Sequence, residues 1–232
     1  MQRPSDYYSA AIGPIYEKYW RYYQELLSKY PDSATGAADL RPALLAMPGN
    51  AITAYYMAMA LLETSLRDPQ WWVRYTPYWS ESEIQVFMKE YDKSIRQGYF
   101  ILFVSRIEWA LRNMIAFLLP GAADGGLAEF KGVTDAVLKL IDRQDLMDVF
   151  DIARHLRNSL HNSGRYFSRR GKDSPLYHYR GREIQFRQGV VIEPATELSF
   201  FLMDDLLDAC KSIADAPVVA APTFVGFVLE GL

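Results

Sequence analysis

The segment from Arg154 to Gly164 gathers the side chains of this chain that are best suited to acid–base and phosphate chemistry. It reads Arg-His-Leu-Arg-Asn-Ser-Leu-His-Asn-Ser-Gly. A helix turns about 100° per residue, so positions 154, 157, 158 and 161 fall within an arc of roughly 100°. One helix face therefore carries the guanidiniums of Arg154 and Arg157, the amide of Asn158 and the imidazole of His161.

These residue types suit the cleavage of RNA without a metal ion. A base must take the proton of a ribose 2′-hydroxyl, and cations must stabilise the charge that develops on the phosphate. Histidine exchanges protons near neutral pH, and arginine is always charged and matches phosphate geometry. The sequence has one cysteine, Cys210, and no His-Glu-x-x-His or Gly-x-Ser-x-Gly motif. We therefore expect no metal site, no cofactor and no serine-hydrolase elbow.

A structural explanation of the same residues stays open. Arginine, asparagine and histidine near the C-terminal end of a helix cap free carbonyls and offset the negative end of the helix dipole. The sequence Asn162-Ser163-Gly164 is also an ordinary helix end. The residue types alone do not decide between a functional motif and a helix terminus.

The charge of the chain is unevenly distributed. Residues 152–189 hold nine Arg and Lys against two Asp and Glu, a net charge of +7, whereas the remaining residues carry −10. All three histidines (His155, His161 and His178) lie in this basic segment. Such asymmetry attracts phosphate or another polyanion to one patch of the surface.

The other side of the predicted motif helix is apolar. Val149, Ile152, Ala153, Leu156 and Leu160 form the stripe that a core would bury. Met147 and Phe150 lie on the polar side, where a solvated helix face would carry charged residues. We therefore expect this polar side to be covered by another chain or segment.

The remaining periodicity predicts a mainly α-helical bundle with a small β-hairpin or meander before the last helix. Aromatic residues at helical spacing predict a helix over 5–30, and Pro48-Gly49 predicts that the next helix begins at Asn50. Ser80 and Glu83 have the spacing of a capping box, and residues 94–119 are apolar almost all round. The predicted divisions are an aromatic-rich extension (1–48), a helical domain (49–215) and an apolar tail (216–232).

The motif resembles that of the HEPN superfamily, in which an arginine is followed by a polar residue, often Asn or His, and four to six residues separate the arginine from a histidine near the end of a long helix. The Arg154 register fits this spacing, with six residues before His161 and with His155 directly after the arginine. The Arg157 register has the characteristic Arg-Asn pair with Asn158, but it departs from the family pattern because only three residues precede His161. The segment 103–112, with Glu108, is similar to the buried family helix whose acidic residue supports the motif.

The resemblance implies an antiparallel helical bundle, frequently a homodimer whose motif helices meet at a composite cleft. It implies metal-independent RNA cleavage, often in toxin–antitoxin or phage-defence systems. His161 would be the general base, Arg154 or Arg157 would steady the phosphate, and Asn158 would orient one of them. The supporting residues would be Glu108, His155 and Asn162, and the RNA backbone would be guided by Arg165, Arg169, Arg170 and Lys172.

Two classes of function remain open on the sequence. One is a HEPN-type endoribonuclease, and the other is a non-catalytic HEPN-like module that binds nucleotide, nucleic acid or an acidic antitoxin, or that dimerises. We expect a cytoplasmic protein, because the sequence has one cysteine and begins without an apolar leader. We expect no membrane span, because residues 51–62 are too few and residues 99–119 are interrupted by charges.

Overall fold

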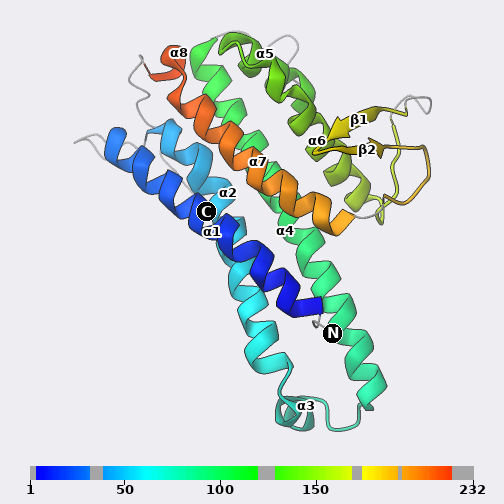
Figure 1. Cartoon of the computed structure of the whole chain (residues 1–232). Coiled ribbons are helices and arrows are strands. Elements are labelled where there is room, and N and C mark those ends of the chain that lie inside the picture. Colours follow the sequence, from blue (N-terminus) through cyan, green and yellow to red (C-terminus); the bar gives the residue numbers. More distant parts are fainter. Residues whose placement is uncertain (1–3, 32–38, 120–128, 169–173, 193–194, 221–232) are drawn as a thin grey trace.

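The computed structural model describes residues 4–31, 39–119, 129–168, 174–192 and 195–220, which form a helical bundle with one small hairpin (Figure 1). The predicted fold class is therefore confirmed. In chain order the elements are α1 (Pro4–Lys29), α2 (Leu40–Leu61), the π-helical turn η1 (Leu62–Leu66), α3 (Pro69–Tyr75), α4 (Glu81–Leu118), α5 (Phe130–Leu140), the short 3-10 helix η3 (Gln144–Leu146), α6 (Met147–His161), β1 (Leu176–Tyr179), β2 (Arg182–Gln185), α7 (Ala195–Asp215) and α8 (Pro217–Ala220).

Helix α4 is the central element of the bundle. It begins at the predicted capping box, in which the Ser80 amide donates to Glu83 Oε2 at 2.7 Å and the Glu83 amide donates to Ser80 Oγ at 3.3 Å. Its C-terminal half buries Phe103, Ile107 and Leu111 completely, and it packs against α2, α5, α6 and α7. Any side chain that α4 directs at α6 is therefore held on a rigid support.

Helix α2 begins at Leu40, so the predicted start at Asn50 is wrong. The carboxylate of Asp39 accepts from the Arg41 amide at 2.8 Å and caps the helix, and Pro48 lies inside it. Proline removes one helical hydrogen bond, but the buried side chains of this segment outweigh that cost. The predicted division at residue 48 falls within this helix.

Helix α1 packs on α2 and α7 and belongs to the same hydrophobic core as the rest of the bundle. The Lys18 ammonium on α1 pairs with Asp204 and Asp208 on α7, each at 2.7 Å. Gly49 on α2 lies directly against the ring of Tyr19 on α1. The predicted N-terminal extension is thus joined to the bundle by both apolar and charged contacts.

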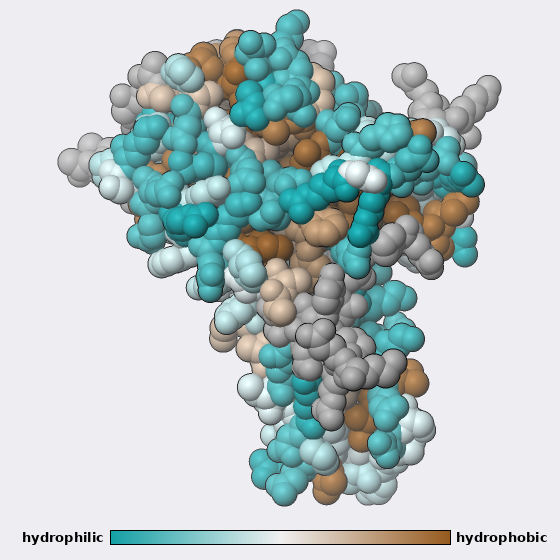
Figure 2. All heavy atoms as spheres, in the orientation of Figure 1, coloured by the Kyte–Doolittle hydropathy of each residue, from teal (hydrophilic) through white to brown (hydrophobic). Residues whose placement is uncertain are grey.

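The end of α2, helix α3 and the first half of α4 form an arm that extends beyond the body of the bundle (Figures 1 and 2). Trp72 is buried near its tip, with its indole N–H donating to the Leu66 carbonyl at 2.5 Å. The ring centroids of Trp79 and Phe87 lie 5.9 and 5.7 Å from that of Trp72. Several other apolar side chains of the arm are exposed, among them Val73, Tyr78 and Val86.

The hairpin is formed by β1 and β2 with the predicted turn at Arg180-Gly181. Both turn residues have positive φ, 48° and 74°, as a tight hairpin turn requires. Tyr179 and Phe186 are buried beneath the hairpin. Among the described residues the predicted third strand is reduced to one bridge, between Val191 and Arg165, so the observed structure is a hairpin rather than a meander.

The continuous helix Leu40–Leu66 is long and apolar enough to cross a membrane by length and composition, and half of its most apolar window is buried in the protein. A core helix of a soluble protein meets the same criteria. This helix is longer than the segment 51–62 on which the expectation of no membrane span relied. That expectation stays a prediction.

Replacing Gly49 by alanine is expected to destabilise the contact between α1 and α2. A Cβ at this position would lie 2.0 Å from Tyr19 Cε2, and Tyr19 is itself buried. Overpacking of this kind costs about 1–3 kcal/mol in free energy of unfolding. Urea denaturation followed by circular dichroism measures the change.

Gly98→Ala is the matched control for this prediction. Gly98 lies within α4, and an added Cβ would meet nothing within 4 Å. Alanine should stabilise a helix at such a position by about 0.5–1 kcal/mol. Equal stability of Gly49→Ala and the wild-type protein would show that α1 does not pack on α2 in this way.

Candidate functional site

Helix α6 presents the motif and buries its opposite side as predicted. Ile152, Ala153, Leu156 and Leu160 lie in the core, which fixes the rotation of the helix. Helix α5 packs beside it. The orientations of the motif side chains therefore follow from the packing of the apolar stripe.

Phe150 is covered by another segment of the same chain, which is one of the two coverings that the sequence left open. Its side chain is only 2% exposed, and its ring lies 6.4 Å from that of Phe130 on α5. Met147 is partly buried against the same core. Phe150 is thus covered within the single chain by α5 and offers no surface to a second subunit.

Arg157 is held by a carboxylate on the central helix. Its Nη1 lies 2.5 Å from Glu108 Oε2, and the other oxygen of Glu108 lies 2.5 Å from Arg112 Nη2. The Arg157 guanidinium also lies over the ring of Phe130, 5.4 Å from its centroid. The predicted support of the motif by Glu108 thus corresponds to a direct contact, and its partner is Arg157.

The two guanidiniums change the acidity of Glu108. Burial by itself would raise the pKa of this carboxyl group, but hydrogen bonds and charge attraction from Arg157 and Arg112 hold the pKa below its usual range. Glu108 is therefore ionised at neutral pH. Its side chain is 18% exposed and that of Arg157 is 14% exposed, so the pair is largely shielded from water.

Arg154 belongs to a different network. Its Nη2 lies 2.9 Å from Asp151 Oδ1 and 3.0 Å from His155 Nε2. Asp151 also pairs with Lys131 on α5 at 3.3 Å. Sequence reasoning missed Asp151 and Lys131. The ion pair between Asp151 and Arg154 could have been predicted from their spacing of three residues in a helix. The contact of Lys131 with Asp151 could not, because it depends on how α5 packs against α6.

His155 is buried under the hairpin. It is 8% exposed, and its ring centroid lies 5.2 Å from that of Tyr166 and 5.0 Å from that of Phe186. Burial, together with the charge of Arg154, lowers its pKa to about 4. The imidazole is therefore neutral at pH 7, and since arginine can only donate, Nε2 accepts from Arg154 and Nδ1 carries the proton.

His161 has the opposite environment. It ends α6, its side chain is exposed, and its imidazole makes no hydrogen bond or ion pair with the other described residues. Asn158 Oδ1 accepts from Arg157 Nε and Nη2, both at 3.3 Å, and the Asn162 amide donates to the Asn158 carbonyl at 2.8 Å. The end of α6 thus joins an anchored arginine, two amides and a free imidazole.

The basic residues expected to guide RNA are only partly described. Arg165 is exposed, and its Nη1 donates to the Gly189 carbonyl at 2.8 Å. Arg169, Arg170 and Lys172 lie outside the described residues. The structure therefore places one of these four cations beside the end of α6.

The acidic residues of α7 come close together, but they have cationic partners. Among the described residues, Asp204, Asp205 and Asp208 form a group whose oxygens lie near enough to hold a metal ion. Lys18 pairs with the first and third, and Arg180 pairs with the first two. These ion pairs satisfy the carboxylates without a metal.

Comparison with known proteins gives no assignment. No family model, curated protein or solved structure matches this chain. A functional proposal therefore has to rest on the residues of the chain and their geometry.

Replacing Glu108 by glutamine is expected to destabilise the protein, because it leaves the guanidinium of Arg157 shielded from water without its carboxylate. Losing a hydrogen bond to a charged group costs about 1.5–3 kcal/mol. Asp145→Asn is the matched control, since Asp145 pairs with Arg143 in an exposed bridge. Such a bridge contributes about 0–1 kcal/mol. Equal losses of unfolding free energy in the two variants would contradict the anchoring role of Glu108.

Because His155 is buried as a neutral group, the free energy of unfolding should decrease as the pH is lowered. Its pKa is about 4 in the folded protein against an ordinary 6.5, so the unfolded chain binds the extra proton between these values. The contribution is fully present above pH 6.5 and is lost as the pH falls toward 4. Between pH 7 and pH 5 the loss amounts to about 1–2 kcal/mol.

Urea denaturation of the wild type and His155→Gln at the two pH values tests this effect. The wild type should lose more stability on acidification than His155→Gln does. His178→Gln, which removes an exposed imidazole on β1, should behave as the wild type does. If His155→Gln loses as much stability as the other two proteins, His155 is not buried as a neutral group.

Proposed function

We propose that this chain is a HEPN-type, metal-independent endoribonuclease whose reacting groups are His161 and Arg157. The observation that carries the proposal is the contact between Glu108 and Arg157. It anchors the arginine to the central helix, one turn before the exposed imidazole. An oriented cation beside a free base is the arrangement that cleavage through the ribose 2′-hydroxyl needs.

The geometry favours Arg157 over Arg154 as the partner of His161. Arg157 makes one short bond to a carboxylate, and its other donors reach only the amide oxygen of Asn158 at 3.3 Å. A phosphate could replace these weak bonds without breaking the ion pair. Arg154 already directs its Nε and Nη2 at Asp151, and its Nη2 also contacts His155.

In the proposed reaction His161 takes the proton of the 2′-hydroxyl. The 2′-oxygen then attacks the adjacent phosphorus, the bond to the 5′-oxygen breaks, and that oxygen takes a proton from solvent water, while protonated His161 returns its proton to solvent. Arg157 stabilises the negative charge on the phosphoryl oxygens. The products would be a 2′,3′-cyclic phosphate and a 5′-hydroxyl end, and Arg165 would contact the RNA backbone beside the site.

The proposal includes a second copy of the chain and a cytoplasmic setting. His161, Asn162 and Arg165 are exposed in the single chain, so a partner's α6 could meet them and complete a cleft. Such a nuclease would act as a toxin or phage-defence effector that an acidic antitoxin restrains. The second copy, the toxin role and the antitoxin are proposed from the resemblance of the motif. Phe150 does not support the second copy, because it is buried within the single chain.

A non-catalytic HEPN-like module is the second candidate, and a specific observation favours it. Arg157 and Arg154 each have a carboxylate partner, Glu108 and Asp151, within the single chain. Both could therefore serve only to join α6 to α4 and to stabilise the helix. In that case the basic end of α6 would bind a polyanion without cleaving it.

RNA cleavage in excess chelator distinguishes the two candidates. The wild type should convert mixed RNA to cyclic-phosphate ends, and a substrate with a 2′-deoxy nucleotide at the cleaved position should stay intact. His161→Ala should lower the rate by about 10²–10⁴-fold, as for loss of a general base. Arg157→Ala should lower it comparably.

His178→Ala and Arg143→Ala serve as controls, because they remove an exposed histidine and an exposed arginine outside the motif. Both should cleave at the wild-type rate. If the wild type binds RNA but leaves it as intact as His161→Ala does, the non-catalytic module is correct and the nuclease proposal fails.

A further inference from the structure

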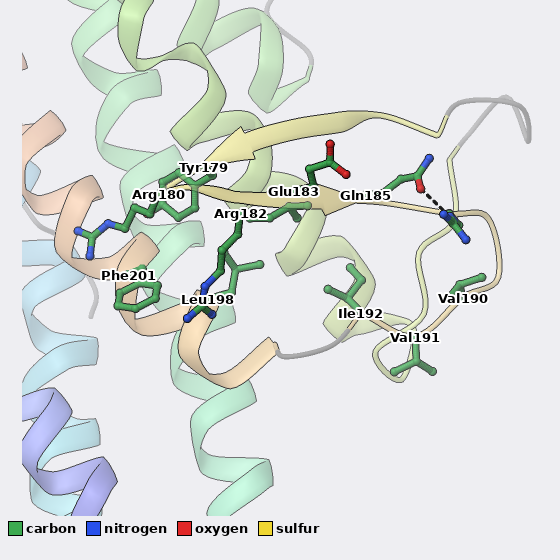
Figure 3. A pocket seen from close by; sticks show the side chains of 12 residues that line it. Tyr179, Arg180, Arg182, Glu183, Gln185, Val190, Val191, Ile192, Leu198 and Phe201 are labelled. Carbon is green, nitrogen blue, oxygen red and sulfur yellow. Dashed lines mark hydrogen bonds between the residues drawn. The ribbon is translucent and has the colours of Figure 1, made fainter.

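A cavity of about 320 Å³ lies between β2, the segment that follows it and the first turns of α7 (Figure 3). Small-ligand sites commonly have volumes of about 300–1,000 Å³. Residues of α6 do not line this cavity, so it is separate from the motif face. Its apolar lining includes Ile184, Ile192, Leu198 and Phe201, which suits a flat, apolar group.

Two of the arginines that line the cavity are already neutralised. Arg180 pairs with Asp204 at 3.0 Å and Asp205 at 2.5 Å, and Arg182 pairs with Glu197 at 2.7 Å. Both guanidiniums also lie over the Phe201 ring, at 4.7 and 5.8 Å from its centroid. These contacts fix one wall of the cavity and leave little charge there for a ligand.

Arg187 differs from the other two. Its Nε donates to the amide oxygen of Gln185 at 2.6 Å, and within the described part of the chain no carboxylate pairs with it. Its side chain is exposed, so its remaining N–H groups are open to a ligand. Glu183 also belongs to the lining, but Figure 3 shows its carboxylate on the side of the strand that faces away from the cavity.

The position of α7 adds to the attraction for an anion. Leu198 lies in the first turn of this helix and lines the cavity, so the N-terminal end of α7 is adjacent. The N-terminus of a helix carries a partial positive charge. An apolar floor, the guanidinium of Arg187 and the N-terminal turn of α7 therefore border the same cavity, with Arg187 toward its Gln185 end and α7 toward its other end.

We propose that this cavity binds a small organic anion with a flat apolar body and one anionic group. The body would lie against Ile192 and Val190, which Figure 3 shows toward the Gln185 end of the cavity, and the anionic group would bind Arg187. A neutral molecule of the same shape would lose the charged contact, and an inorganic anion would lose the apolar contact. The site does not depend on RNA cleavage.

The fluorescent probe 1-anilinonaphthalene-8-sulfonate matches this class of ligand, and N-phenyl-1-naphthylamine is its counterpart without the sulfonate. In fluorescence titrations the wild type should bind the sulfonate probe at one saturable site. Arg187→Gln should weaken that binding about tenfold, the effect of losing one charge-assisted contact, and leave the neutral probe unaffected. Arg143→Gln should match the wild type for both probes.

Ile192→Trp supplies a second, independent variant, because the larger side chain fills the cavity. It should abolish saturable binding of both probes, with folding checked by circular dichroism. If Arg187→Gln binds the sulfonate probe as tightly as the wild type, the proposal is overturned. Unchanged binding by folded Ile192→Trp would overturn it too, since the probe would then occupy another surface such as the aromatic tip of the arm.

Discussion

One carboxylate, Glu108 on α4, pairs with two guanidiniums, those of Arg112 on its own helix and of Arg157 on α6. A partly buried charge is costly unless it is paired and hydrogen-bonded, so this arrangement fixes how α6 lies on the central helix. The apolar stripe of α6 and the ring of Phe130 hold the same geometry from the other sides. The C-terminal end of α6, which carries the exposed His161, directly follows this fixed part of the helix.

The three histidines show why position along the chain does not determine chemistry. All three lie in the basic segment, but His155 is packed among aromatic rings and stays neutral, whereas His161 and His178 are exposed.

Ion pairs with carboxylates reduce the net positive charge of the same segment. Of its described arginines, four pair with carboxylates, whereas the partners of Arg165 and Arg187 within the described part of the chain are neutral. Among these six arginines, the positive charge that is not paired with a carboxylate is therefore limited to Arg165 and Arg187.

The parts of the fold that depend on local sequence were predictable. The capping box at Ser80, the turn at Arg180-Gly181 and the apolar stripe of α6 are each specified by residues close together in the chain. The start of α2 was not, because the packing of the helix outweighs the usual effect of Pro48 and Gly49. The covering of Phe150 was expected, but the sequence could not choose between a second chain and another segment, since a single helix does not reveal which neighbour covers it. For the site, the sequence identified Glu108 but could not choose between Arg154 and Arg157, because their carboxylate partners depend on tertiary packing.

The central claim is that His161 acts as the base beside an arginine anchored by Glu108, and chemical rescue tests it most directly. His161 is exposed, so free imidazole can reach the space that a smaller side chain leaves. Added imidazole should restore RNA cleavage to His161→Gly in chelator, with a rate that rises with imidazole concentration, but should not restore it to Arg157→Ala. Undiminished cleavage by His161→Gly without imidazole, or a failure of imidazole to restore it, would contradict the account.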